Sequence, residues 1–190
     1  AVPQIYYTVR PKDWPVAFGL GLYTPFGLGL EWPKSVPFRT LAKEGRILYA
    51  TLNPVIAWEV SPSLSIAAGP TFSYSEAFLS QGLVPGGQFG YKDVFKFQGE
   101  DTAAGFNVGI LWRLHEQLYL GGTYRSAVTM NYSGGAHGVI PGVIDSQGSA
   151  RTSGFDLPQN FVIGLSYRPT PQWNFEFDVD WTDWDTLDTV

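Results

Sequence analysis

The chain has 190 residues, with 16% aromatic and 15% charged side chains, 22 glycines and 14 prolines. A formal net charge of −5 without a lysine or arginine cluster excludes a nucleic-acid partner, because neutralising phosphates needs a basic face. The absence of cysteine excludes a disulfide framework, a thiol nucleophile and a thiolate metal site. The abundance of strand and turn formers predicts a single all-β domain over residues 1–190.

Apolar and polar residues alternate with a period of two along most of the chain, which predicts β-strands. No run of about 18 apolar residues is available for a membrane helix, so any membrane crossing must be made by strands. In chain order the predicted strands cover residues 5–10, 14–23, 46–60, 64–74, 103–114, 118–132, 161–167 and 173–181.

The hairpin at 103–133 shows which face of these strands is wet. Phe106, Ile110 and Leu120 share an apolar face, whereas Asn107 and Arg125 share the opposite face with several glycines. An arginine, an asparagine and bare glycines would make a poor dry core. We therefore predict an antiparallel transmembrane β-barrel with its apolar face toward lipid and its polar face toward a wet lumen. A secreted β-sandwich with the apolar face inward stays open, because periodicity alone does not distinguish the two.

Short and long connections alternate along the chain. Short turns lie around Pro11, Pro62, Glu116 and Pro169, and the long links cover residues 24–45, 75–101 and 134–154. Outer-membrane barrels have this asymmetry, with short periplasmic turns and long extracellular loops. Several aromatic residues also lie near strand ends, where they would form an interfacial girdle.

Four stretches resemble one family, the FadL/TodX-type outer-membrane transporters of long-chain fatty acids and aromatic hydrocarbons. They are FGLGLYTPFGL at 18–28, NPVIAWEVSPSLSIAAGP at 53–70, GFNVGILWRL with LGGTYRSAV within 105–128, and DLPQNFVIGLSYRPTPQWNFEFDVDWTDWD at 156–185. The resemblance implies a fourteen-stranded barrel in the bacterial outer membrane. About eight strands would be present here, without the N-terminal hatch and the last strands, so we expect a processed or partial chain.

The resemblance also implies a transport route. In the family, hydrophobic loop segments catch the ligand, a lumen pocket receives it, and an inward strand kink releases it sideways. The strand with Gly19, Gly21 and Pro25 occupies the matching place, and glycine and proline are the residues that interrupt a strand.

Two groups of residues are candidates for ligand binding. The link at 75–101 is too apolar for an ordinary solvated loop, and exposed apolar patches mark interaction sites. Its candidates are Phe78, Leu79, Leu83, Val84, Phe89, Phe95 and Phe97, unless the link folds on itself to cap the barrel. The second is Arg125, whose guanidinium suits a carboxylate head group; alternatively it pairs with Glu176 or Asp178 and stiffens the wall.

Catalysis is not indicated. Glu176, Asp178 and Asp180 line one stripe, as glycosidase carboxylates can, but nothing else indicates a sugar site. His115 and His137, the two histidines, have no partners at triad or metal spacing. We expect no metal and no cofactor.

Three hypotheses follow. The first is a monomeric, passive transporter of hydrophobic small molecules, embedded in outer-membrane lipid. The second is the secreted sandwich, binding or cleaving polysaccharide. The third, a barrel enzyme, requires a hydrolytic side chain that the strands lack.

Overall fold

The computed structural model describes residues 4–187, and most of them lie in β-strands. The strands are β1 (Ile5–Val9), β2 (Val16–Tyr23), β3 (Gly27–Glu31), β4 (Glu44–Ser61), β5 (Leu64–Gln81), β6 (Val94–His115), β7 (Leu118–Arg125), β8 (Val128–Met130), β9 (Ser133–Ile140), β10 (Ile144–Arg151), β11 (Phe155–Leu157), β12 (Asn160–Thr170) and β13 (Trp173–Thr182). Two short 3-10 turns, η1 (Pro85–Gly87) and η2 (Trp184–Leu187), complete the described chain. None of its helices is long and apolar enough to cross a membrane.

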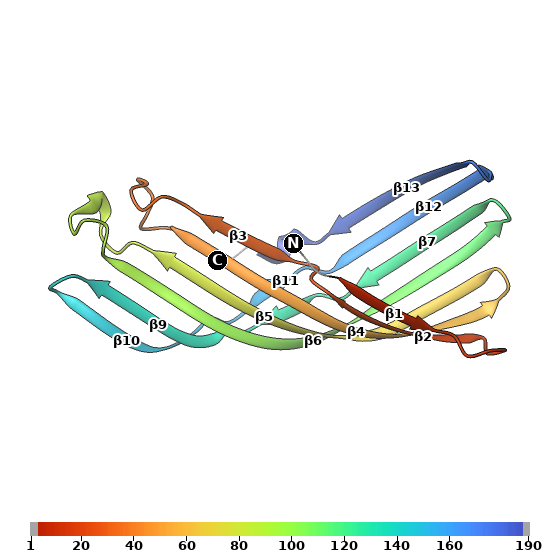
Figure 1. The fold of residues 1–190 in the computed structure, drawn as a ribbon, viewed down its shortest axis with the longest axis horizontal. Helices are drawn as coiled ribbons and strands as arrows, with labels where there is room; N and C mark the ends of the chain where they lie inside the picture. The colour runs from red at the N-terminus through yellow and green to blue at the C-terminus, as the bar shows by residue number, and fades with distance from the viewer. Residues whose placement is uncertain (1–3, 188–190) are drawn as a thin grey trace.

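One antiparallel sheet forms a curved wall. Its strands follow the order β1-β2-β4-β5-β6-β7-β12-β13, while β3 adds to β4, and β9 adds to β6 and carries β10 (Figure 1). Eight strands along this path agree with the predicted number. Among residues 4–187, β1 and β13 do not pair with each other, so the wall is an open arc.

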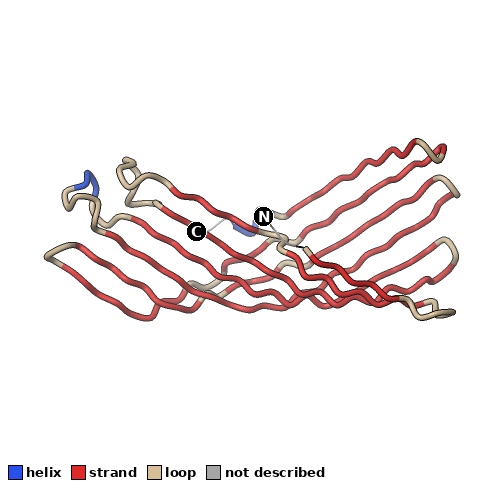
Figure 2. Tube along the Cα trace, viewed as in Figure 1, coloured by secondary structure: helices blue, strands red, loops and turns tan. Residues whose placement is uncertain are grey.

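The two ends of the wall differ as predicted. The β1–β2, β4–β5, β6–β7 and β12–β13 connections are short and lie at one end, on the right of Figures 1 and 2. The β3–β4 and β5–β6 loops and the tip of the β9–β10 hairpin lie at the other end. We call these the short-turn end and the loop end.

The three predicted long links are wrong in extent, because each contains strand. Residues 27–31 of the first link form β3, which pairs with β4. The second link shrinks to residues 82–93, since β5 runs to Gln81 and β6 begins at Val94. The Gly- and Ser-rich third link forms the β9–β10 hairpin. Only the third segment lacks apolar alternation, and backbone pairing alone holds it in strands. In the other two, Leu28 and Leu30 alternate with glycines, and Phe95 and Phe97 alternate with Lys96 and Gln98.

The apolar stripes face outward. Phe106 and Phe177 are 50% and 68% exposed, whereas Thr71 and Ser73 on the opposite face of the wall are nearly completely buried. A soluble sandwich would bury the phenylalanines between two sheets and expose the hydroxyls. The observed orientation is that of a membrane barrel, which turns its apolar residues to lipid.

A second, two-stranded sheet covers the inner face of the wall. Here β8 pairs with β11, and we call this unit the inner layer. Its buried side chains pack on inward residues of β4, β5 and β6, and the cluster consists of Tyr49, Ala77, Phe97, Val128, Met130, Tyr132 and Leu157. The chain leaves the wall after Arg125 and returns at Ser133. Gly105 permits the departure, because a Cβ there would lie 2.6 Å from the Ser126 hydroxyl.

Candidate functional site

The wall is interrupted between β2 and β3. Both strands pair with β4, Tyr23 opposite Thr51 and Gly27 opposite Leu48, so three residues, 24–26, face two residues of β4. One extra residue in one strand is a β-bulge, which bends the strand and breaks the ladder. Pro25 stands inside this interruption and has no N–H to offer the ladder. We call residues 24–26 the wall break.

The two glycines predicted at the kink lie elsewhere. Gly19 and Gly21 are in the regular part of β2, paired on both sides with β1 and β4. They line an inward hollow of about 280 Å³, together with residues of β1 and β4 that include Thr8, Asn53 and Ala57. Because glycine has no side chain, the hollow lies directly against the backbone; we call it the lumen hollow.

Asparagines connect three strands at the edge of this hollow. The Asn107 amide donates to Asn53 Oδ1 over 2.8 Å, and Asn53 Nδ2 donates to the carbonyl of Pro70 over 2.8 Å. Asn53 to Val55 form no ladder pairs with β5, and the asparagine amide takes over one of the missing bonds. The Tyr23 hydroxyl approaches Asn53 Oδ1 at 3.5 Å.

Arg125 lies next to this network, above the ring of Tyr23, with 5.3 Å between its Cζ atom and the ring centroid. Its Nε atom is buried and has no hydrogen-bond partner within residues 4–187. The alternative pairing with Glu176 or Asp178 is not formed, since the ion pairs of the described chain do not include Arg125. A buried cation donor without an acceptor carries a cost that an anionic group would relieve.

A narrow passage connects Arg125 with the wall break. Both Pro25 and Phe26 line it, as do Arg125 and the hydroxyl residues Thr51 and Ser73 of the wall. Its free volume is about 10 Å³, enough for about one water molecule.

The predicted loop candidates do not form one site. Phe78 and Leu79 belong to β5, Phe95 and Phe97 belong to β6, and Leu83, Val84 and Phe89 lie in the β5–β6 loop. Phe97 is buried in the cluster under the inner layer. In contrast, Phe78 lies on the outer face below the guanidinium of Arg46, with 6.0 Å between the Arg46 Cζ atom and the ring centroid of Phe78.

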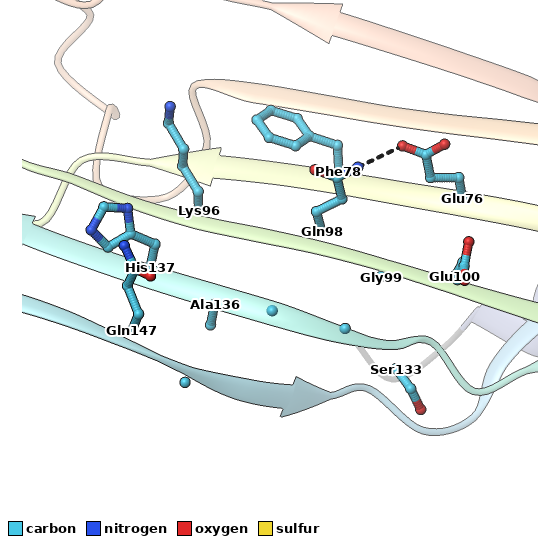
Figure 3. Close-up of a pocket in the computed structure, with 13 residues that line it drawn as sticks. Glu76, Phe78, Lys96, Gln98, Gly99, Glu100, Ser133, Ala136, His137 and Gln147 are labelled. Atoms are coloured by element: carbon cyan, nitrogen blue, oxygen red, sulfur yellow. Dashed lines mark hydrogen bonds between the residues drawn. The ribbon is translucent and has the colours of Figure 1, made fainter.

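Phe78 lines a groove of about 600 Å³ on the outer face near the loop end (Figure 3). The groove continues the face that carries Phe72 and Tyr74 lower on β5, but its own lining includes Glu76, Lys96, Gln98, Glu100 and His137. Tyr74 donates to Glu100 over 2.6 Å, and His137 contacts Asp145 at 2.9 Å. The change from apolar to charged side chains along one face marks the upper limit of the lipid-facing belt.

A buried ion pair joins two loops at the loop end. Arg39 is 1% exposed and Asp93 is completely buried, and Arg39 Nη1 donates to Asp93 Oδ2 over 2.8 Å. Asp93 Oδ2 also accepts the N–H groups of Leu83 and Val84 over 2.8 and 2.7 Å. The bond from Arg39 and these two N–H groups lower the pKa of Asp93 to about 2, against the opposing effect of burial. We call Arg39 and Asp93 the loop clamp.

Three of these features were not expected from the sequence: Phe26, the inner layer and the loop clamp. The short apolar run Val128–Met130 was absorbed into a predicted wall strand, because alternation does not reveal that a strand has left the sheet. Arg39 and Asp93 are 54 positions apart, a separation at which sequence offers no sign of pairing. The described residues contain no group of three side chains arranged to hold a metal ion.

Comparisons with known proteins agree on one family. The family described as "Outer membrane protein transport protein (OMPP1/FadL/TodX)" matches residues 1–190. The long-chain fatty acid transport protein of Salmonella typhi is 21% identical over 96% of this chain and 48% of its own length. The chain spans about half the length of the curated relatives it matches.

Solved structures show the same fold. A Pseudomonas aeruginosa FadL homologue superimposes with a TM-score of 0.82 at 19% identity, over 98% of this chain and 49% of that one. The Ralstonia pickettii toluene transporter TbuX also gives 0.82, at 18% identity, over 97% of this chain and 55% of that one. The relatives are transporters rather than enzymes.

Proposed function

Because this chain belongs to the OMPP1/FadL/TodX family of outer membrane transport proteins, we propose that it forms part of a passive route for hydrophobic small molecules across the bacterial outer membrane. The protein acts as a monomer in outer-membrane lipid and needs no cofactor. Transfer of the ligand from water into an apolar site drives uptake. The ligands are long-chain fatty acids or aromatic hydrocarbons.

The lumen hollow is the observation that carries this proposal. Its volume of about 280 Å³ exceeds the roughly 150 Å³ of a cavity that accepts benzene. Gly19 and Gly21 keep it open, and Tyr6 and Asn53 supply a ring and an amide at its border.

Arg125 supports a head-group site beside the hollow. Its buried Nε has no hydrogen-bond partner within residues 4–187, so it can receive a carboxylate once the narrow passage at Thr51 and Ser73 widens, while the hydrocarbon tail occupies the hollow. A fatty acid would use this site, whereas a monoaromatic hydrocarbon would use only the hollow.

The two ends of the route complete the proposal. Leu83, Val84 and Phe89, in the loop beside the clamp, make the first apolar contact with the ligand. Ligand leaves sideways into the membrane at the wall break, where Pro25 interrupts the ladder. A polysaccharide-binding sandwich lacks support, because the aromatics it would use face outward from a single curved wall.

Uptake by the full-length protein in lipid vesicles tests this function. Labelled palmitate, hexadecane and toluene should each enter protein-containing vesicles faster than empty ones. Gly19→Leu fills the hollow without striking the backbone, because the nearest atom to a Cβ there is 3.8 Å away, and it should lower uptake at least five-fold. The matched control is Gly29→Leu, whose Cβ meets open space, and its uptake should stay at the wild-type rate.

Arg125→Gln separates the two ligand classes. It should reduce uptake of palmitate about ten-fold, since a charge-assisted hydrogen bond contributes roughly 1.5 kcal/mol or more, and leave toluene unchanged. Equal uptake of all three compounds by wild type, Gly19→Leu and empty vesicles would contradict the proposal.

A further inference from the structure

The wall break is closed from inside by one aromatic side chain. Phe26 packs edge-on against Tyr49, with 5.6 Å between ring centroids, and against Trp184 of η2, with 6.3 Å. Tyr49 belongs to the buried cluster that holds the inner layer to the wall. The side chain at the break therefore reaches inward and rests on the structures that fill the lumen.

The inner layer forms the other side of the narrow passage. Val128 of β8, and Leu157 of β11 with the following Pro158, line it opposite Pro25 and Phe26. On β4, Thr51 lines the passage and Asn53 lines the lumen hollow, two residues apart on one face. The passage is thus the next space after the hollow on the way to the break.

This passage is too small for any hydrocarbon. Its free volume of about 10 Å³ compares with roughly 150 Å³ for a cavity that holds benzene. Passage therefore requires that Phe26, the inner layer or both move.

The inner layer packs on the wall without being paired into its ladder. No ladder pair joins β8 to β6, because pairing of β6 on this side stops at Asn107 and resumes at Glu100. The layer is anchored at its corners, where Ser126 exchanges two bonds with Phe106 of about 3.0 Å, and Asp101 accepts the Asn131 N–H over 2.6 Å. Two strands of three residues held by apolar contacts form a unit that can shift without breaking the wall.

We propose that Phe26 and the inner layer form a size filter between the lumen hollow and the wall break. Phe26, Leu157 and Val128 determine which hydrophobic molecules reach the membrane, and displacement of Phe26 from Tyr49 opens the passage. This inference rests on the proposed transport function.

A pair of ligands that differ only in width tests the filter. Toluene and 1,3,5-trimethylbenzene are offered to the full-length protein in vesicles. In wild type toluene should enter faster, and Phe26→Ala, which removes a ring from the passage, should raise the ratio of trimethylbenzene to toluene uptake at least three-fold. The matched control Phe72→Ala removes an outward-facing ring and should leave this ratio unchanged.

A crosslink tests whether the passage must open. These 190 residues contain no cysteine, so Phe26→Cys with Leu157→Cys places one thiol on each side of the passage. A short, cleavable thiol crosslinker is applied after the protein has folded in the vesicles, which separates gating from folding. Crosslinking should lower toluene and palmitate uptake at least ten-fold, cleavage should restore it, and each single-cysteine variant should not respond.

The outcomes separate this inference from the proposed function. If wild-type protein transports but the crosslinked double variant transports equally well, the filter is wrong and the transport function stands. An unchanged width ratio in Phe26→Ala, with heat-dependent gel mobility proving a folded barrel, also overturns the filter. If wild type transports none of the compounds, the transport function fails and the filter fails with it.

Discussion

The short-turn half and the loop half of the wall are built differently, although the same strands run through both. Toward the short turns, β6, β7, β12 and β13 pair in order, with a register shift only beside the β6–β7 and β12–β13 turns. Their apolar side chains face lipid, and small or polar ones face inward. Toward the loops, β2 and β3 are interrupted and the chain departs inward to form β8 and β11. The departures create the passage and the break, whereas the hollow lies against the regularly paired backbone of β1, β2 and β4.

Ion pairs differ between the two halves in the same way. Arg10 and Glu59 meet at 2.5 Å near the short turns, with side chains 56% and 36% exposed. At the loop end, Arg39 and Asp93 are buried at a similar separation. Exposed pairs contribute little because water screens them, whereas breaking a buried pair leaves an uncompensated charge. Equivalent substitutions at the two ends should therefore have very different effects.

The largest effect is expected at the loop clamp. Arg39→Ala orphans the Asp93 carboxylate and should lower the free energy of unfolding by about 3–5 kcal/mol, or release the two loops from each other. Arg10→Ala at the opposite end should cost less than about 1 kcal/mol. Urea titration of the full-length protein in vesicles measures the free energy of unfolding of both variants. Protease cleavage within residues 82–93 reports whether the two loops have separated. Equal stability losses in the two variants would contradict the difference between the ends.

The inner layer should be the next most sensitive region. Met130 is completely buried between β8 and the wall, so Met130→Ala leaves a cavity and should cost about 2–5 kcal/mol. Leu165→Ala, on the lipid face of β12, should cost clearly less, because lipid fills the space that the side chain leaves. The same urea titration compares them, and a smaller loss for Met130→Ala would mean that the layer is only loosely packed.

The lipid face of the short-turn half should reject charge. Ile110→Lys places an ammonium on the outer face and should destabilise the barrel by about 2–4 kcal/mol near the bilayer midplane. Asn107→Lys, three residues away on the inner face of the same strand, should be tolerated better, because the lumen is wet. The refolding yield of each variant into vesicles is read from heat-dependent gel mobility, and it should be lower for Ile110→Lys than for Asn107→Lys. The opposite order would mean that the face carrying Asn107, not the face carrying Ile110, meets lipid.

The smallest expected effect is a pH dependence confined to the loop end. Folding lowers the pKa of Asp93 from its ordinary value near 3.8 to about 2, so its contribution to stability is complete above pH 4 and is lost as pH falls toward 2. Protease cleavage of the β5–β6 loop should therefore increase between pH 4 and 2, measured with an acid-active protease. In Asp93→Asn this increase should be absent, and a wild-type response centred near pH 6 would exclude Asp93 as the cause.

Alternation in the sequence identified the eight strands on the main path of the wall, the face of each of them that meets lipid and the end at which the short turns lie. Each follows from local rules, because a period of two assigns side chains to faces and a Pro-containing turn closes a hairpin. It could not reveal that Gly134 to Gly154 contains a hairpin. Backbone pairing forms this hairpin, and the glycines and serines in it show no alternation of apolar and polar side chains.

Only the tertiary structure decided where the candidate site lies. Pro25 could be read as a kink, but the position of Phe26 against Tyr49 and Trp184 depends on contacts between residues far apart in the chain. The residues of β8 were predicted as part of a strand and form one, but they pack on the inner face of the wall instead of joining it, and β11 was not predicted as a strand. Register and local propensity depend on residues that are neighbours in the sequence. The packing of one sheet on the inside of another depends on the curvature of the whole wall.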